Sequence, residues 1–318
     1  MIENYLHFLV SLIISFSVLI PLPQRMISYY APPFYQEKEA TVLFAGDMMF
    51  DRSVRNTVDA KGGNFIFSCI DPLLAQQDLV VANLEGPITS HASISATSTP
   101  GDPNNFTFTF PPSTARLLFA HNIRMVNIGN NHIMNFSRDG LLETKAYLQA
   151  AHVEFFGDPD SSEADKVARI SIHGIPVSLV NWSDWTSDNT DHTIDQVRKE
   201  KESGRIVFVY THWGEEYVEP LPRVRQLAHS FIDAGAEIVI GSHPHIVQEH
   251  EVYDSTTLTT GRGKNIYYSL GNFIFDQYWN DEVRHGLMLE VVFTERGVHS
   301  VHEIPVELGR DRRTCPIS

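Results

Sequence analysis

The chain has 318 residues, which is enough for one large α/β domain or two smaller ones. Its hydrophobic fraction of 42% supports an ordinary globular core. The net charge of -15, from 24 Lys and Arg against 39 Asp and Glu, argues against a nucleic-acid-binding protein, because such a protein needs a basic surface. The two cysteines, Cys69 and Cys315, lack the spacing of a zinc motif, and whether they pair is left open.

The N-terminus is apolar almost without interruption from Tyr5 to Ile20. This run is slightly shorter than the roughly 20 residues of a membrane-spanning helix, and it lacks the basic residues that begin a signal peptide. We expect residues 1–22 to be a membrane anchor or signal-anchor, with its cleavage left open, and residues 23–39 to be a linker. Arg25 weakly favours the cytoplasm for its own side of the anchor, so the orientation also stays open.

From Ala40 to Asn280, short apolar runs are each followed by a sharp polar turn, and several of these turns by a helical pattern. The apolar runs predict buried strands, and helices are predicted at Ser137–Ala151 and Arg223–Ala234. The runs in chain order are TVLFAGD, DLVVANLEG, IRMVNIGNNH, IPVSLVNWSD, RIVFVYTHWGEE, AEIVIGSHPH and KNIYYSLGNF. After Asn280 the polarity alternates, which predicts antiparallel strands or a hairpin. Residues 40–318 are therefore predicted to form an α/β domain.

The stretch AEIVIGSHPHIVQ contains the first candidate metal ligands. Ile238–Ile240 predicts a short buried strand, and His243, Pro244 and His245 follow it. Pro244 fixes its own φ and favours an extended conformation for His243. At a loop tip, two such imidazoles can diverge enough to reach two metal ions about 3.5–4 Å apart. Taken alone, the pair is almost as well explained by two surface histidines.

Similar polar side chains follow the other predicted strands. In an open α/β sheet, ligands bind beyond the carboxyl ends of the strands, so these side chains are expected to gather there. Each has a simpler explanation by itself, such as a helix N-cap for Asp47 or a turn residue for Asn131. Nitrogen and oxygen donors of this mixture suit Zn, Mn or Fe. The candidate ligands of a divalent metal are Asp47, Glu85, Asn131, His212, His243 and His245, with His132 next to Asn131.

Several motifs occur in an order that resembles one known family. They are GDMMFDR, NLEGPIT, GNNH, HWGEE, GSHPHIVQ and SLGNFIFDQ. This order resembles the CapA/PgsA poly-γ-glutamate capsule synthesis proteins, which are similar in fold to the calcineurin-like metallophosphoesterases. The resemblance extends from about Thr41 to about Glu290, and the hydrophobic N-terminus is similar as well. It implies a layered sandwich of mixed β-sheets flanked by helices, in a membrane-anchored protein whose domain lies outside the cytoplasm.

The resemblance also implies roles for individual residues. Asp47 matches the start of an Asp-x-His motif, but Met49 stands where that motif has His, so one ligand is absent. Glu85 matches a metal-bridging residue, and His132 matches a general acid or transition-state stabiliser. The expected firm site comprises Asn131, Glu85, His212 and His243, and the conditional site comprises Asp47, Glu85 and His245. The residues expected to line the pocket are Arg52, Glu215 and Asn272. The turn of Trp182, Asp184 and Trp185 is a candidate to flank the substrate, although Trp more often has a packing role.

The function implied is the synthesis or export of poly-γ-glutamate or a similar anionic polymer, with a metal-dependent hydrolase site. The bond cleaved is either a phosphoester or a γ-glutamyl or other amide bond, because the same metal chemistry serves both. The partners implied are the anionic polymer or a phosphoester substrate, and other membrane proteins of polymer synthesis. Two alternatives stay open: a stand-alone metal-dependent hydrolase with an unrelated substrate, and a non-catalytic anion-binding module, which the missing His at position 49 favours.

Overall fold

Strand β1 (Glu39–Met48) lies inside the larger of two sheets and is buried on both faces. Successive side chains of a strand point to opposite faces, so its apolar residues divide between two cores. Leu43 and Ala45 pack into one core, and Val42 and Phe44 pack into the other. This computed structural model describes residues 37–160, 166–186, 190–255 and 263–317.

The larger sheet has the strand order β14-β13-β12-β1-β2-β3-β4, and β11 also pairs with β1. The pairs from β1 to β4 are parallel, whereas β12, β13 and β14 are antiparallel. The bounds are β2 Leu79–Leu84, β3 Ile123–Asn127, β4 Glu154–Phe156, β11 Asn272–Ile274, β12 His285–Thr294, β13 Gly297–Leu308 and β14 Thr314–Pro316. The prediction of antiparallel strands after Asn280 is confirmed.

The smaller sheet has the order β5-β6-β7-β8-β10-β9, with parallel pairs in the middle and an antiparallel pair at each edge. The bounds are β5 Val167–Ile172, β6 Ile175–Ser183, β7 Ile206–His212, β8 Ile238–Ser242, β9 His250–Tyr253 and β10 Lys264–Tyr267. The run KNIYYSLGNF, predicted as one strand, forms β10 here and then starts β11 in the larger sheet. Between them Gly271 has a φ of +66°, which permits the sharp change of direction.

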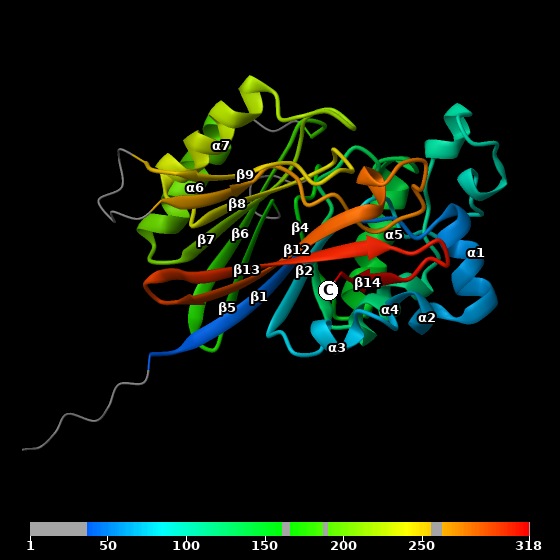
Figure 1. The fold of residues 1–318 in the computed structure, drawn as a ribbon, viewed down its shortest axis with the longest axis horizontal. Coiled ribbons are helices and arrows are strands. Elements are labelled where there is room, and N and C mark those ends of the chain that lie inside the picture. Colours follow the sequence, from blue (N-terminus) through cyan, green and yellow to red (C-terminus); the bar gives the residue numbers. More distant parts are fainter. Residues whose placement is uncertain (1–36, 161–165, 187–189, 256–262, 318) are drawn as a thin grey trace, which may run out of the picture. The chain divides into compact units, whose positions relative to one another are not determined.

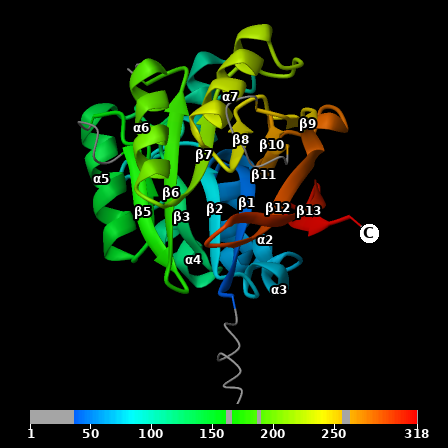
Figure 2. The same ribbon diagram turned by 90° about the vertical axis from the view of Figure 1, so that its left-hand side faces the viewer.

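Helices cover the outer faces of the two sheets (Figures 1 and 2). The helices on the larger sheet are α1 Arg52–Lys61, α2 Gly63–Phe67, α3 Asp71–Leu74, α4 Ser113–Ala120 and α5 Ser137–Ala150. The smaller sheet is covered by α6 Thr190–Glu202 and α7 Pro222–Ala234. Short 3₁₀ turns are η1 Ser95–Thr97, η2 Pro103–Phe106 and η4 Glu282–Arg284. The helices predicted from sequence match α5 and α7 to within one residue.

The two sheets pack face to face through a core of their own. Phe44 from β1 and Leu289 from β12 meet Phe208 and Tyr210 from β7 in this core. The Phe44 and Phe208 ring centroids lie 5.4 Å apart in an edge-to-face contact. With the helices outside, the layers are helix, sheet, sheet and helix. The predicted layered sandwich of mixed sheets is confirmed, and it brings strand ends from two sheets together.

A disulfide joins Cys69, in the turn after α2, to Cys315 in β14, with their Cα atoms 4.9 Å apart. It ties the outermost strand of the larger sheet to the helices beneath that sheet, and answers the question of pairing that the sequence left open. The predicted anchor, residues 1–22, and nearly all of the predicted linker, residues 23–39, lie outside the described residues. Within the described part, none of the helices has the length and apolar character needed to cross a membrane.

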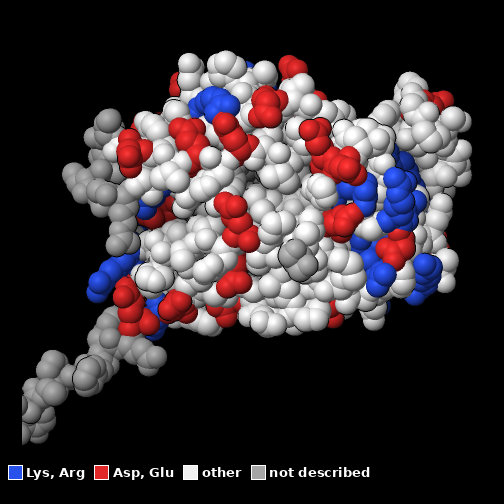
Figure 3. All heavy atoms as spheres, viewed as in Figure 1, with Lys and Arg blue, Asp and Glu red and all other residues white. Residues whose placement is uncertain are grey.

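Charge is unevenly distributed over the surface. On the face shown in Figure 3, Asp and Glu are scattered widely, whereas the largest group of Lys and Arg gathers where α1 and the turn between β13 and β14 lie. A protein of net charge -15 therefore has one side on which an anion is not repelled.

Candidate metal centre

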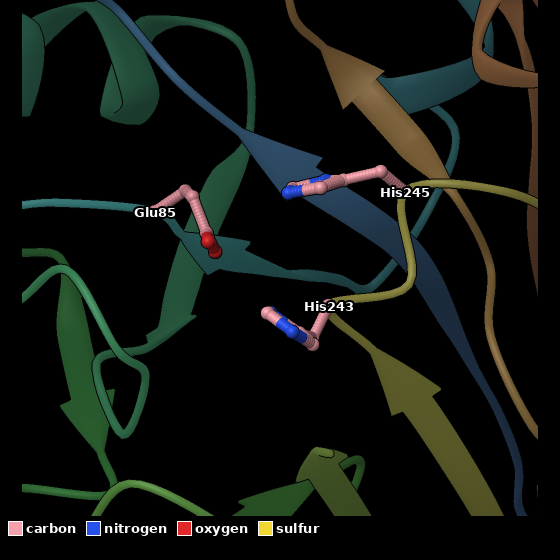
Figure 4. A group of neighbouring side chains, drawn as sticks. All are labelled: Glu85, His243 and His245. Atoms are coloured by element: carbon pink, nitrogen blue, oxygen red, sulfur yellow. The ribbon is translucent and has the colours of Figure 1, made fainter. Parts of the chain in front are cut away.

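The candidate ligands lie where parallel strands of both sheets end. Asp47 is near the end of β1, Glu85 follows β2, and His212 is the last residue of β7. His243 and His245 follow β8, and Figure 4 shows both imidazoles directed toward the space that the Glu85 carboxylate faces. All five side chains are buried. The gathering predicted from the strand ends is therefore present, although it is made between two sheets rather than along one.

Two groups of three residues are tight enough to hold one ion each. One ligand atom from each of Glu85, His243 and His245 lies within 4.8 Å of the others, and the same holds for Asp47, Glu85 and His212. Glu85 belongs to both groups, which is the position that a bridging ligand requires. The grouping differs from the division predicted from sequence, which placed His243 with His212 and His245 with Asp47.

The two carboxylates are held together by an asparagine that the sequence did not single out. Asn83 lies opposite Asp47 in the β1–β2 register. Its Nδ2 donates to Asp47 Oδ1 at 2.8 Å and also to Glu85 Oε2. Burial, and then the nearby Asp47 charge, raise the pKa of Glu85 well above its usual value. Glu85 Oε1 is buried and has no hydrogen-bond partner among the described residues.

The tautomer of His212 follows from its neighbour Ser242. The Ser242 hydroxyl donates to the Thr211 carbonyl at 2.8 Å, so its oxygen accepts from His212 Nδ1 at 2.9 Å. His212 Nε2 then carries a lone pair, which faces Asn131 Oδ1 at 3.0 Å and Glu85 Oε1 at 3.6 Å. One nitrogen and two oxygens, each able to ligate a metal ion, therefore converge here. A cation is the group that such an arrangement suits.

The loop after β8 does not adopt the conformation predicted from Pro244. His243 has a φ of +96° and His245 a φ of +58°, so the expectation of an extended His243 is wrong. The His243 N–H donates to Asp47 Oδ2 at 3.1 Å, and this bond from another strand outweighs the local preference. Residues held in such sparsely populated conformations cluster at functional sites.

His245 is oriented by Asn272, one of the residues predicted to line the pocket. The Asn272 amide donates to Gln277 Oε1 and to the Val283 carbonyl, both at 3.0 Å, so its Oδ1 is the acceptor for His245 Nδ1 at 3.0 Å. His245 Nδ1 also lies 3.3 Å from Asp47 Oδ2. The other ring nitrogen, Nε2, is therefore the one available to a metal ion.

The imidazoles of His212 and His243 are neutral near pH 7. Burial, followed by the charges of His245 and His132, lowers the pKa of His243 to about 2. Burial also lowers the pKa of His212 well below its usual value. Metal ions bind the neutral imidazole, so these shifts favour ligation. His243 Nδ1 is buried without a hydrogen-bond partner among the described residues, as Glu85 Oε1 is. The residues present fit a divalent cation.

His132 lies beside the carboxylates without belonging to either group of three. Its Nε2 is 4.0 Å from Glu85 Oε1, and its ring lies 4.4 Å from that of Phe108. The Asn135 amide donates to the Phe106 carbonyl at 2.7 Å and to His132 Nδ1 at 3.2 Å. His132 therefore has its proton on Nε2, which faces the centre.

The other residues predicted near the site differ in how close they lie to the centre. Trp185 packs against His243 with ring centroids 4.1 Å apart, so it flanks the centre. Arg52 lies one aromatic layer away, over the rings of Phe108 and Phe275. Glu215 is exposed, whereas the charge of its neighbour Glu216 contributes to the raised pKa of Glu85. Sequence reasoning missed Glu216 because adjacent carboxylates in a loop look alike.

The remaining sequence alternatives concern the first strand. Asp47 is buried in the centre, and the N-cap of α1 is Asp51 instead, whose side chain accepts from the Arg52 N–H. Met49, which replaces a histidine in the resembled motif, is buried in the helix-side core, and its Sδ accepts from the Asp51 N–H at 3.0 Å. The centre consequently has no ligand from position 49.

The comparisons with known proteins agree with this architecture. The family model described as bacterial capsule synthesis protein PGA_cap matches residues 41–277. The chain is 27% identical over 291 residues to the PGA biosynthesis protein CapA of Bacillus subtilis (strain 168), a match that covers 86% of this chain and 73% of that protein. It is 26% identical over 299 residues to the capsule biosynthesis protein CapA of Bacillus anthracis, covering 87% and 70%.

A more distant relative is a probable polyglutamine synthesis accessory protein of Mycobacterium tuberculosis. It is 26% identical over 226 residues, which cover 63% of this chain and 56% of that protein. The family match includes the ends of β1, β2, β3, β7 and β8, where the candidate ligands lie. Because the match covers well over half of the sequence, this chain belongs to the bacterial capsule synthesis protein family PGA_cap.

Proposed function

We propose that this chain is a membrane-anchored CapA-type protein that acts in the synthesis or export of poly-γ-glutamate and carries a metal-dependent hydrolytic site. The relatives' names, which refer to PGA, capsule and polyglutamine, support the pathway. The single observation that carries the metal site is the convergence of three ligand atoms, His212 Nε2 with Asn131 Oδ1 at 3.0 Å and Glu85 Oε1 at 3.6 Å.

This arrangement is costly without a cation. Glu85 and Asp47 are fully buried, and a buried charge without a partner is strongly unfavourable. The residues that would hold the cation are Asp47, Glu85, Asn131, His212, His243 and His245. A divalent ion bound there, such as Mn, Zn or Fe, supplies Lewis-acid polarisation of a phosphoryl or carbonyl oxygen and lowers the pKa of water to about 7.

The chain's own groups complete the chemistry. His132 presents its Nε2 proton toward the centre, so it donates a hydrogen bond to the oxygen on which negative charge develops. Burial, and then the His245 charge, lowers the pKa of His132 to about 3, so its neutral form is the one present near pH 7. The role that suits it is therefore stabilisation of the transition state by a neutral donor, rather than proton delivery from an imidazolium.

The location we propose is outside the cytoplasm. Disulfides form and persist in oxidising compartments, and Cys69–Cys315 is a disulfide. The apolar segment 1–22 would attach the domain to the membrane, near other membrane proteins of polymer synthesis. Thiol labelling of protein isolated from cells under non-reducing conditions tests this location. Full labelling of both cysteines would contradict it.

The test of the site is metal content per chain, measured by mass spectrometry on the full chain after loading with Mn or Zn. We expect close to two ions in the wild type and about one in either Asp47→Ala or His243→Ala, because each variant removes a ligand from one of the two groups of three. His299→Ala is the matched control, since it removes an exposed imidazole near the start of β13 that is not one of the candidate ligands. Absence of bound metal under every loading condition would favour the anion-binding module instead.

The test of the pathway is genetic. Replacement of the chromosomal gene by the His243→Ala form should change the yield or the length of the polymer that the cells make. If the polymer is unchanged in these cells and the variant protein is present at normal abundance, the protein does not act in that pathway through the proposed hydrolytic site.

A further inference from the structure

A cavity of about 350 Å³ adjoins the candidate metal centre on the α1 side. It lies between the start of α1, the loop that contains η1 and η2, and the segment after β11. Its lining is mainly polar, with Arg52 as its cation and Trp279 as its large aromatic wall. The lining also includes Ser53, Asn56, Ser98 and Asn105. This cavity has no part in the metal ligation described above.

Arg52 connects the cavity to the centre. Its guanidinium lies over the Phe108 ring at 5.0 Å and over the Phe275 ring at 5.6 Å. On their other sides, Phe108 packs against His132 at 4.4 Å and Phe275 packs against His245 at 4.9 Å between ring centroids. One layer of aromatic rings therefore separates the cavity from the residues proposed to carry the chemistry.

The hydrogen-bonding capacity of Arg52 is only partly used. The side chain is 14% exposed, and it forms an ion pair with Asp276. Its bonds to Asn105 are long, at 3.4 and 3.5 Å, and its Nε has no partner among the described residues. The other oxygen of Asp276 accepts from the Ser53 N–H and hydroxyl. Arg52 also has a φ of +50°, which is uncommon for a residue other than glycine.

Two arginines lie close together at the cavity although the chain is acidic. Arg312 Nε donates to the Ser53 hydroxyl at 2.8 Å, and its guanidinium lies over the Tyr278 ring at 4.6 Å. Asp276 lines the cavity too, and Arg52 contacts it directly whereas Arg312 reaches it through Ser53. This is the side of the molecule on which Lys and Arg gather in Figure 3. An anion that approaches the centre meets a favourable field here.

An aromatic wall leads from the cavity to the centre. Trp279 is 61% exposed, and its ring packs edge-on against Tyr217 at 5.3 Å. The Tyr217 ring lies 6.1 Å from that of His245. Trp279 and Tyr217 thus form two adjoining exposed aromatic surfaces. A flat amide unit or a methylene pair would pack against this wall.

We propose that the cavity is a subsite for a carboxylate of a γ-linked polyglutamate chain, bound by Arg52, with the backbone of the chain packed along Trp279 toward the metal centre. The proposal rests on the proposed function for the identity of the polymer. Arg52 supplies a charge-assisted hydrogen bond to the carboxylate, and the adjoining amide unit reaches the centre.

Calorimetric binding of a short γ-linked glutamate oligomer to the full chain tests the subsite, both with Mn and with a chelator. Arg52→Gln should weaken binding by about tenfold or more, the effect of losing a charge-assisted hydrogen bond. Asn56 is exposed on α1 and lines the cavity, so Asn56→Glu should weaken binding and Asn56→Lys should tighten it without disturbing the fold. Arg198→Gln is the control, because Arg198 is an exposed arginine paired with Asp195 on α6.

The outcomes are distinguishable. Binding that is unchanged in Arg52→Gln and in both Asn56 variants overturns the subsite. So does wild-type binding that is equally tight for a γ-linked glutamine oligomer, or cavity-dependent binding of inorganic phosphate without binding of the glutamate oligomer. If no metal loads but binding still depends on Arg52 and Asn56, the hydrolytic site fails and the subsite stands. If metal loads and binding ignores both positions, the subsite alone fails.

Discussion

Two buried carboxylates at opposite ends of the parallel strands, Glu85 and Glu237, have opposite surroundings. Glu85 is 0% exposed and Glu237 is 3% exposed. Glu237 immediately precedes β8, and its two oxygens accept from the ammonium groups of Lys201, at 2.7 Å, and of Lys264. Glu85, beyond the end of β2, has one oxygen bonded to Asn83 and the other without a partner among the described residues.

The pKa values record the same contrast. Burial by itself would raise the pKa of Glu237, but the hydrogen bonds from Lys201 and Lys264 outweigh it and lower that pKa. The pKa of Glu85 is raised by burial and by the Asp47 charge, and no Lys or Arg among the described residues offsets them. Glu237 is a completed structural ion pair, and Glu85 has the surroundings of a metal ligand that the chain does not complete by itself.

The largest expected effect comes from Glu85→Gln, which removes the charge and keeps the shape. Metal affinity should fall by more than about 100-fold, because even a residue that only orients a ligand is worth up to that factor. The chelated protein should become more stable, since the new amide can donate toward His212 Nε2 and the buried carboxyl group beside Asp47 is removed. Metal titration and thermal unfolding with a chelator measure the two effects.

Glu237→Gln is the matched control for that experiment. It should leave metal affinity unchanged and reduce stability in the presence of metal or chelator alike. If Glu85→Gln instead destabilises the chelated protein as Glu237→Gln does, the two carboxylates play the same structural part and the contrast between them fails.

The positions of Glu85 and of the candidate histidines at strand ends are predictable from sequence. Glu85 and the histidines follow apolar runs, and the end of a parallel strand is where ligands bind in α/β folds. The packing of two sheets face to face, which brings His212 from β7 next to Asn131 after β3, depends on contacts between distant segments. Those contacts leave no local pattern. The resemblance to the capsule synthesis family supplied the sandwich, whereas composition and alternation predicted only an α/β domain.

Other features were missed for identifiable physical reasons. Asn83 lies inside a strand, and one polar residue in an apolar run has no periodicity that marks it as the link between Asp47 and Glu85. His243 was expected to be extended because Pro244 follows it, but its N–H bond to Asp47 is a tertiary contact that overrides the local preference. The splitting of KNIYYSLGNF between two sheets depends on Gly271, whose positive φ a sequence does not display.

The next effect in size is the loss of stability in Glu237→Gln, about 2 kcal/mol at neutral pH for a buried hydrogen-bonded charge. The stability that Glu237 contributes decreases as the pH falls. The pKa of Glu237 is lower in the folded protein than in the unfolded chain, so the stabilisation is fully present above the unfolded value of about 4.3. It is lost as the pH falls through the folded value.

Urea unfolding of wild type and Glu237→Gln from about pH 7 to about pH 3 measures this dependence. The two curves should converge at the acid end, where both side chains are neutral. A gap of constant size across the range would mean that packing rather than charge accounts for the difference.

The smallest effect concerns Ser242, which fixes the tautomer of His212 from outside the centre. Ser242→Ala removes the acceptor for His212 Nδ1–H and leaves every proposed ligand in place. Metal affinity should fall by about tenfold, the lower figure for a residue that orients a ligand. Ser178→Ala is the control, because Ser178 is equally buried in the same sheet but bonds to Glu200 and Arg205. It should lower stability and leave metal affinity unchanged.

Equal metal affinities in the two variants would show that His212 keeps its Nε2 lone pair without Ser242. The argument for the cation would then rest on Asn131 and Glu85 alone.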